Sequence, residues 1–326
     1  MKAYIESIGV ISRCAKSADE LTKVQNGGGY EKAALPIEFE SQIPPAKMRR
    51  NSRYNKFACT AADNAVRETA IPEALDRRRI GTIISTGYGS SVNNTQFAET
   101  VTKGVPGLCS PYIYAGTVPN SCVGQICILN GFKGVSTVLT GGDPLEYSAL
   151  LLAANKADMI LCGSVEEYCE ALYSELGGLD TLKGAQLSEG TAMMMMTRER
   201  TEKTLYAVTG FSCASLGKSP LLHRIDEGAF DIITDILKKH ETAPDAVFTA
   251  ANGTYFDDIE SKAIKTIFPE TELVSPKKWA GETLGCGYMM NTAFAAAAIS
   301  SGKYKKVLVT GVDMVGNYCT SMIEGV

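Results

Sequence analysis

Short apolar runs rich in β-branched residues alternate along the chain with longer runs rich in alanine and leucine. The short runs, for example Ile80–Thr86, Ala246–Ala250 and Lys306–Thr310, are predicted to be buried strands. The longer runs Leu145–Lys156 and Tyr288–Ser300 have the length and composition of buried helices. This alternation predicts an α/β fold in which helices cover both faces of buried sheets.

One pattern of turn, helix and strand occurs twice. Gly141-Gly142-Asp143 precedes the first apolar helix, and the strand after that helix ends in glycine. Gly285-Cys286-Gly287 precedes the second apolar helix, and the strand after it also ends in glycine. The repeat predicts two similar halves, residues 1–196 and 197–326, packed as a single compact unit. A site would then lie where the strand ends of the two halves meet.

The composition excludes several classes of protein. The chain has 326 residues, 45% of them apolar, and a formal net charge of −4, so it can bury a large core. It has no basic run dense enough to bind a nucleic-acid backbone, no apolar stretch of the roughly 20 residues that span a bilayer, and no apolar signal core in segment 1–6. The ten cysteines are scattered without the spacing of a metal site. We therefore expect a cytoplasmic globular protein without metal, cofactor, nucleic-acid partner or membrane span.

Four segments carry a family resemblance. Val118–Ile126 followed by Gly131–Gly134 has the pattern PN-x-x-x-GQI-x-x-x-x-G-x-KG, and Glu189–Ala192 is similar to a GEGAG strand. Ala251–Thr254 and Lys277–Gly287 are similar to His-Gly-Thr and Lys-x-x-x-Gly-His-x-x-Gly motifs. Together these segments resemble the β-ketoacyl-acyl-carrier-protein synthases (ketosynthases) of the thiolase superfamily. The resemblance implies a thiolase-like α/β fold, with two pseudo-symmetric halves packed in layers (αβαβα).

At the family's reactive positions this chain carries other residues. The resemblance places Gly142 at the nucleophilic cysteine and Asn252 and Glu282 at the two histidines, whereas Lys277 matches the family's active-site lysine. In the family the thiol lies at a helix N-terminus, where the helix dipole favours thiolate and neighbouring amides hold an oxyanion. Glycine has no side chain to attack a thioester, so the resemblance implies a chain without the Cys-His-His triad.

The replacement residues have a chemistry of their own. Asn252 can still donate a hydrogen bond from its amide. Glu282 would repel a developing anion if ionised but could donate a hydrogen bond if burial protonates it, and pairing with Lys277 would favour the charged form. Asp143 is expected to cap the following helix rather than to act as a nucleophile, because its attack on a thioester would give an anhydride no more stable than the substrate.

Any remaining pocket is expected near the strand ends. The resemblance assigns to it Asp143, Thr254, Gly285, Cys286, Asp313 and Asn317. In the segment Thr310–Asn317, which matches the family's C-terminal gate, Asn317 is the residue that clearly survives. Cys286 is expected to be a packing residue rather than a relocated nucleophile. The two histidines, His223 and His240, are expected to be solvated residues at helix ends.

The resemblance implies a role beside a catalyst. We expect a subunit of the chain-length-factor type, inactive alone, which serves an active ketosynthase in fatty-acid, polyene or polyketide biosynthesis. The expected partners are that ketosynthase, in a heterodimer, or a second copy in a homodimer, together with an acyl carrier protein. By resemblance the dimer forms on Val118–Gly134 and Ser136–Thr140. Two alternatives stay open: an acyltransferase of the thiolase fold with relocated catalytic residues, and a module that binds an acyl group or a carrier protein.

Overall fold

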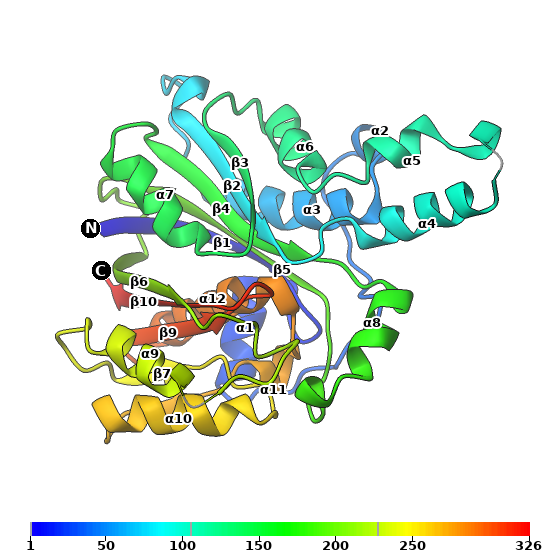
Figure 1. The fold of residues 1–326 in the computed structure, drawn as a ribbon. Helices are drawn as coiled ribbons and strands as arrows, with labels where there is room; N and C mark the ends of the chain where they lie inside the picture. The colour runs from blue at the N-terminus through cyan, green and yellow to red at the C-terminus, as the bar shows by residue number, and fades with distance from the viewer. Residues whose placement is uncertain (1, 105, 227) are drawn as a thin grey trace.

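The computed structural model describes residues 2–104, 106–226 and 228–326 (Figure 1). Strands and helices alternate along the chain, as the hydrophobic pattern predicts. The strands are β1 (Lys2–Ile11), β2 (Ile80–Thr86), β3 (Ser136–Thr140), β4 (Met159–Glu166), β5 (Gly190–Thr197), β6 (Tyr206–Ser215), β7 (Ala246–Phe248), β8 (Glu272–Val274), β9 (Lys306–Val312) and β10 (Asn317–Gly325). The helices are α1 (Ala18–Gln25), α2 (Pro45–Met48), α3 (Arg53–Glu68), α4 (Ser91–Thr102), α5 (Pro111–Ala115), α6 (Ser121–Asn130), α7 (Pro144–Ala153), α8 (Glu170–Gly177), α9 (Gly228–Leu237), α10 (Phe256–Ile267), α11 (Lys277–Ala280) and α12 (Gly287–Ser300).

The strand order repeats between the two parts of the sheet. The full order is β3-β2-β4-β5-β1-β6-β10-β9-β7-β8. In the first part β2 runs parallel to β3 and β4, and β5 runs antiparallel to β4 and β1. In the second part β7 runs parallel to β8 and β9, and β10 runs antiparallel to β9 and β6. The two parts therefore have the same topology and join through the antiparallel pair β1 and β6.

The two parts pack in five layers. Figure 1 shows α3 and α6 on the outer side of the β1–β5 part and α9 and α10 on the outer side of the β6–β10 part. The central layer holds α7 and α12, whose apolar residues belong to one core cluster with the inward faces of both parts. In α12 every residue from Gly287 to Ile299 is buried, which fits its alanine-rich sequence. The expected αβαβα arrangement is confirmed.

Most predicted elements are confirmed, but one residue is not where the sequence suggests. β2 has the predicted bounds, and α7 and α12 lie where apolar helices are predicted. His240, expected at a solvated helix end, is instead 7% exposed, and its Nε2 lies 2.8 Å from Oγ1 of Thr320 on β10. Burial lowers the pKa of His240 to about 4. His223 is exposed, as expected.

Two cysteines far apart in the sequence form a disulfide. Cys213 on β6 and Cys319 on β10 are direct partners in the antiparallel register, with 4.2 Å between their Cα atoms. The sequence spacing of the cysteines gives no sign of this bond, because register between strands sets it. The predicted division of the chain at residue 196 falls at the end of β5 and stays a prediction.

Candidate functional site

The turn between β3 and α7 is the position that the resemblance assigns to the nucleophile. Gly141 and Gly142 both have positive φ angles, +82° and +89°, which favour glycine. The next residue, Asp143, caps α7, because its Oδ1 accepts hydrogen bonds from the backbone N–H groups of Leu145 at 2.7 Å and Glu146 at 3.0 Å. The expected capping role of Asp143 is therefore confirmed.

Asp143 faces the protein interior. Its other carboxylate oxygen, Oδ2, accepts a hydrogen bond from the hydroxyl of Tyr288 at 3.1 Å, and that hydroxyl also lies 2.8 Å from Oγ of Ser321. Burial raises the pKa of Asp143 to about 7. Asp143 thus stabilises the N-terminus of α7 and does not line the cavity beside Gly142.

The turn between β9 and β10 closes over the two glycines. The backbone N–H of Gly142 donates to Oδ2 of Asp313 at 2.5 Å, and the side-chain amide of Asn317 donates to the same oxygen at 2.7 Å. The amide that would face a bound carbonyl at the assigned nucleophile position therefore already has an acceptor inside the chain.

The cavity at this position is very small. It encloses about 10 Å³, at most the room for a single water molecule and far too little for an acyl group. Gly142, Gly285, Asp313 and Asn317 line it, so four of the residues singled out in the sequence converge here. Figure 1 shows how they arrive from separate parts of the fold, with β3 in the upper part and β9 and β10 in the lower part. In this structure the expected pocket is closed.

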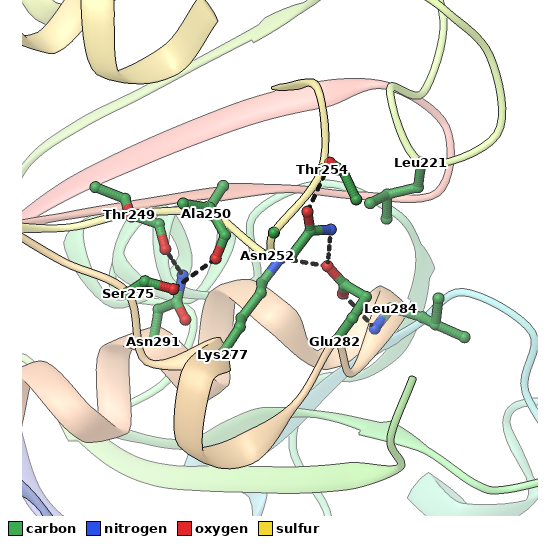
Figure 2. Close-up of polar contacts among 12 residues, drawn as sticks. Leu221, Thr249, Ala250, Asn252, Thr254, Ser275, Lys277, Glu282, Leu284 and Asn291 are labelled. Carbon is green, nitrogen blue, oxygen red and sulfur yellow. Dashed lines mark hydrogen bonds and ion pairs between the residues drawn. The ribbon is translucent and has the colours of Figure 1, made fainter. Parts of the chain in front are cut away.

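The residues at the two assigned histidine positions form a second cluster (Figure 2). Oε2 of Glu282 accepts from Nζ of Lys277 at 2.6 Å and from Nδ2 of Asn252 at 2.7 Å. Oε1 of Glu282 accepts from the backbone N–H of Leu284 at 2.8 Å. The side chains of Lys277 and Glu282 are 3% and 0% exposed, so this is a buried ion pair. The expected pairing of Lys277 with Glu282 is confirmed.

Hydrogen bonds among its own members and to neighbouring backbone hold the second cluster together. The amide oxygen of Asn252 accepts from the hydroxyl of Thr254 at 2.7 Å, and its nitrogen is held by Glu282. The backbone N–H of Glu282 donates to the carbonyl of Gln186 at 2.7 Å, and its carbonyl accepts from Ser188 at 2.8 Å. Glu282 is thereby fixed at both its main chain and its side chain. This arrangement ties three segments together, and one of the two N–H donors of the Asn252 amide is held by Glu282 rather than free for a developing anion.

Cys286 lies behind the cavity and not on its wall. Its side chain is fully buried, and its Sγ donates to the carbonyl of Ser164 at 3.5 Å. Burial raises the pKa of this thiol, because the thiolate would lose its solvation. These are the properties of a packing residue, as the sequence suggests.

Glu166 is a site residue that the sequence reasoning missed. Its carboxylate accepts from the backbone N–H groups of Gly87 at 2.7 Å, Tyr88 at 2.9 Å and Gly285 at 3.2 Å. It is fully buried, and burial raises its pKa to about 7 even though these donors favour the charged form. Glu166 joins the turn after β2 to the turn before α12. The available signal was an acidic residue directly at the end of the apolar strand β4.

The described residues contain neither a metal-binding cluster nor a membrane-spanning helix. Across 2–104, 106–226 and 228–326, no three His, Cys, Asp or Glu side chains come together as a metal site would require. Among the helices of these same ranges, none is long and apolar enough to cross a bilayer.

The fold has two repeated five-stranded parts around central buried helices, and a strand-to-helix turn of one part faces the strand ends of the other. These features define a protein of the thiolase-like class. The family model for the β-ketoacyl synthase N-terminal domain matches residues 12–201, more than half of the chain. The chain belongs to the β-ketoacyl synthase family.

Individual relatives agree with this assignment. The chain is 23% identical over 282 residues to the mitochondrial 3-oxoacyl-[acyl-carrier-protein] synthase of Arabidopsis thaliana, covering 75% of this chain and 61% of that protein. It therefore spans less than two thirds of that curated relative. Among solved structures, the ishigamide ketosynthase/chain length factor matches with a TM-score of 0.82 and 19% identity over all of both chains. A chain of AntDE:AntF, a type II PKS acyl-carrier protein in complex with its ketosynthase, matches with a TM-score of 0.79 and 16% identity over 100% of this chain and 99% of that one.

Proposed function

We propose that this chain is the non-catalytic, chain-length-factor-type partner of an active ketosynthase that works on carrier-protein-bound chains in fatty-acid, polyene or polyketide biosynthesis. The observation that carries the proposal is the closed cavity of about 10 Å³ at Gly142, a residue without a side chain. Acyl transfer needs a nucleophile and a space in which the acyl group meets it, and neither is present at this position.

An exposed apolar face beside β3 supports a partner subunit. β3 is the last strand at its end of the sheet and, within the described ranges, pairs with β2 alone. The neighbouring α6 exposes Ile128 at 77%, and Figure 1 shows α4 and α5 extending beside it as an arm that exposes Tyr112 and Tyr114. Large exposed apolar side chains gathered on one face are typical of a protein interface. This face contains the segments Val118–Gly134 and Ser136–Thr140 that the family resemblance assigns to the dimer.

A basic groove on the same face suits a carrier protein. The groove holds about 970 Å³. Lys47, Arg49 and Arg50 line it from α2 and the turn that follows, and Tyr112 and Ile128 line it from α5 and α6. The chain as a whole has a net charge of −4, so this gathering of positive charge is local. A groove of this charge favours an acidic partner surface or a phosphate-bearing arm, and a ketosynthase bound beside β3 would complete its wall.

Co-expression tests the proposal. The chain and the ketosynthase encoded beside it are expressed together, and the complex is analysed by affinity capture and size exclusion. We expect a stable one-to-one heterodimer with condensing activity that neither subunit shows alone. A homogeneous homodimer that ignores every neighbouring ketosynthase would refute the proposal and favour a module that acts without a second subunit.

A matched pair of variants locates the interface. Ile128→Arg places a charge in the exposed apolar face and is expected to abolish the heterodimer. Leu205→Arg changes another exposed apolar residue, directly before β6 and far from β3 in the strand order, and is expected to leave the heterodimer intact. Equal loss in both variants would show that the β3 face is not the interface.

Thiol labelling tests the acyltransferase alternative. Because Cys286 is fully buried with a raised pKa, a chloroacetyl or cerulenin-type reagent is expected to leave it unmodified near neutral pH. Intact mass and peptide mapping give the result. Stoichiometric labelling of one cysteine at this site would restore the case for relocated catalysis.

A further inference from the structure

The carboxylate of Asp313 has the surroundings of a bound anion. Its Oδ2 accepts from the backbone N–H of Gly142 at 2.5 Å and from Nδ2 of Asn317 at 2.7 Å. Its Oδ1 accepts from the backbone N–H groups of Val315 and Asn317, each at 2.9 Å. Four donors thus converge on one carboxylate that is only 9% exposed. One of them comes from a turn 171 residues away in the sequence.

The glycine turn is shaped to admit this carboxylate. Gly141 and Gly142 are consecutive residues with positive φ, and in this turn the N–H of Gly142 points at Oδ2 of Asp313. A Cβ atom on Gly141 would lie 2.8 Å from Oδ2 of Asp313, so a side chain there would push the carboxylate away. A Cβ atom on Gly142 would meet nothing within 4 Å. The close approach therefore depends on glycine at position 141.

The β9–β10 turn holds Asp313 in this position from behind. The carbonyl of Asp313 accepts from the hydroxyl of Ser219 at 2.9 Å. Gly316 has a φ of +93°, and a Cβ atom on it would lie 2.5 Å from the backbone of Lys218. The turn is thus pressed against residues 218 and 219, with its carboxylate aimed at the glycine turn.

We propose that the Gly141-Gly142 turn and Asn317 form a carboxylate-binding site that Asp313 fills as an internal plug, and that a small external carboxylate binds there when this side chain is removed. The plug occupies the N–H of Gly142, so a thioester carbonyl cannot reach that amide while Asp313 holds it. This goes beyond a role as partner subunit, because it concerns a ligand site within a single chain. It holds or fails whether or not the chain binds a ketosynthase.

The test replaces the side chain and supplies the ligand from solution. Asp313→Ala removes the carboxylate and leaves the four donors, and sodium formate is the probe because it has the same two oxygens in the smallest form. Thermal unfolding is followed in formate and in sodium chloride at equal ionic strength. We expect the melting temperature of Asp313→Ala to rise by about 2 °C more in formate than in chloride at a concentration near ten times the dissociation constant. Wild type is expected to show no such difference.

A matched variant and a local probe separate binding at this site from a general salt effect. Asp313→Asn keeps the shape of the side chain and fills the site, so formate is expected to give it no selective stabilisation. In the alanine variant the backbone amide signals of Gly142 and Asn317 are expected to shift as formate is added, and those of exposed loops to stay in place. If the alanine variant does not fold in chloride, its refolding yields in formate and in chloride are compared instead, and we expect the higher yield in formate.

Three results would overturn the proposal. Formate could stabilise Asp313→Ala no more than chloride does, formate could stabilise wild type and Asp313→Asn equally well, or the amide of Gly142 could fail to respond. The heterodimer assay uses a second chain and none of these measurements does, so the two proposals can fail separately.

Discussion

Among the ion pairs of the described residues, we expect the buried pair of Lys277 and Glu282 to cost the most stability when one partner is replaced. Their side chains are 3% and 0% exposed, and Nζ lies 2.6 Å from Oε2. Glu282→Gln removes the negative charge but leaves the ammonium group buried, and it turns a new amide toward the donors of Lys277 and Asn252. Loss of one partner of a buried pair typically costs about 3–5 kcal/mol, a large share of the roughly 5–15 kcal/mol that stabilises a domain.

A double-mutant cycle isolates the interaction. Lys277→Met is expected to cost a comparable amount, because the carboxylate then keeps Asn252 and the N–H of Leu284 but has no opposite charge. The double variant Lys277→Met/Glu282→Gln buries no unpaired charge, so its cost should fall below the sum of the single costs by at least about 2 kcal/mol. Free energies of unfolding come from urea titrations followed by tryptophan fluorescence and circular dichroism.

An exposed pair serves as the control. Lys238 and Asp235 are 2.9 Å apart, but their side chains are 59% and 72% exposed. Asp235→Asn is therefore expected to change stability by less than about 0.5 kcal/mol. Additive costs in the buried cycle, or a loss below about 1 kcal/mol for Glu282→Gln, would refute the view that this cluster is a structural tie.

Three more predictions follow from the same structure. The pKa of His240 falls from about 6.5 in the unfolded chain to about 4 in the fold. Its stabilising effect is therefore present above pH 6.5 and is lost as the pH falls toward 4. In thermal unfolding, the stability difference between wild type and His240→Gln should shrink between pH 7 and pH 4.5. The Cys213–Cys319 disulfide joins residues 106 positions apart, so reduction or Cys213→Ser should lower the free energy of unfolding by about 2–5 kcal/mol. Alkylation of the unfolded, unreduced protein should modify eight cysteines rather than ten. Gly142→Ala should cost about 1–2 kcal/mol from its positive φ alone, and Gly141→Ala should cost more in the same urea assay, because its Cβ would also lie 2.5 Å from a neighbouring side chain.

Local features of the chain were predictable from the sequence. The apolar runs locate β2, α7 and α12 because burial requires such runs wherever helices cover both faces of a sheet. Asp143 was recognisable as a helix cap because a cap depends on a few neighbouring residues. Lys277 and Glu282 lie five residues apart, so their pairing also needed little knowledge of the fold.

Contacts set by the fold were not predictable from the sequence alone. The link between Asp313 and Gly142 joins two turns from different parts of the sheet, and neither turn indicates its partner. His240 follows two lysines and precedes a glutamate, which suggests a solvated helix end, but Thr320 on β10 covers it. Glu166 ends a strand of apolar residues, yet only the packed turns around it show why an acid is there.

The edge strands at the two ends of the sheet differ in length, and this limits how copies of the chain can pair through the sheet. β3 offers a free edge of five residues, whereas β8, at the opposite end, has only three. A protein with long free strands at both ends can add subunits head to tail without limit and grow into fibres. With one long edge and one blunted edge, growth through the sheet stops when the long edge is covered. The unequal edges therefore disfavour open filaments built strand to strand.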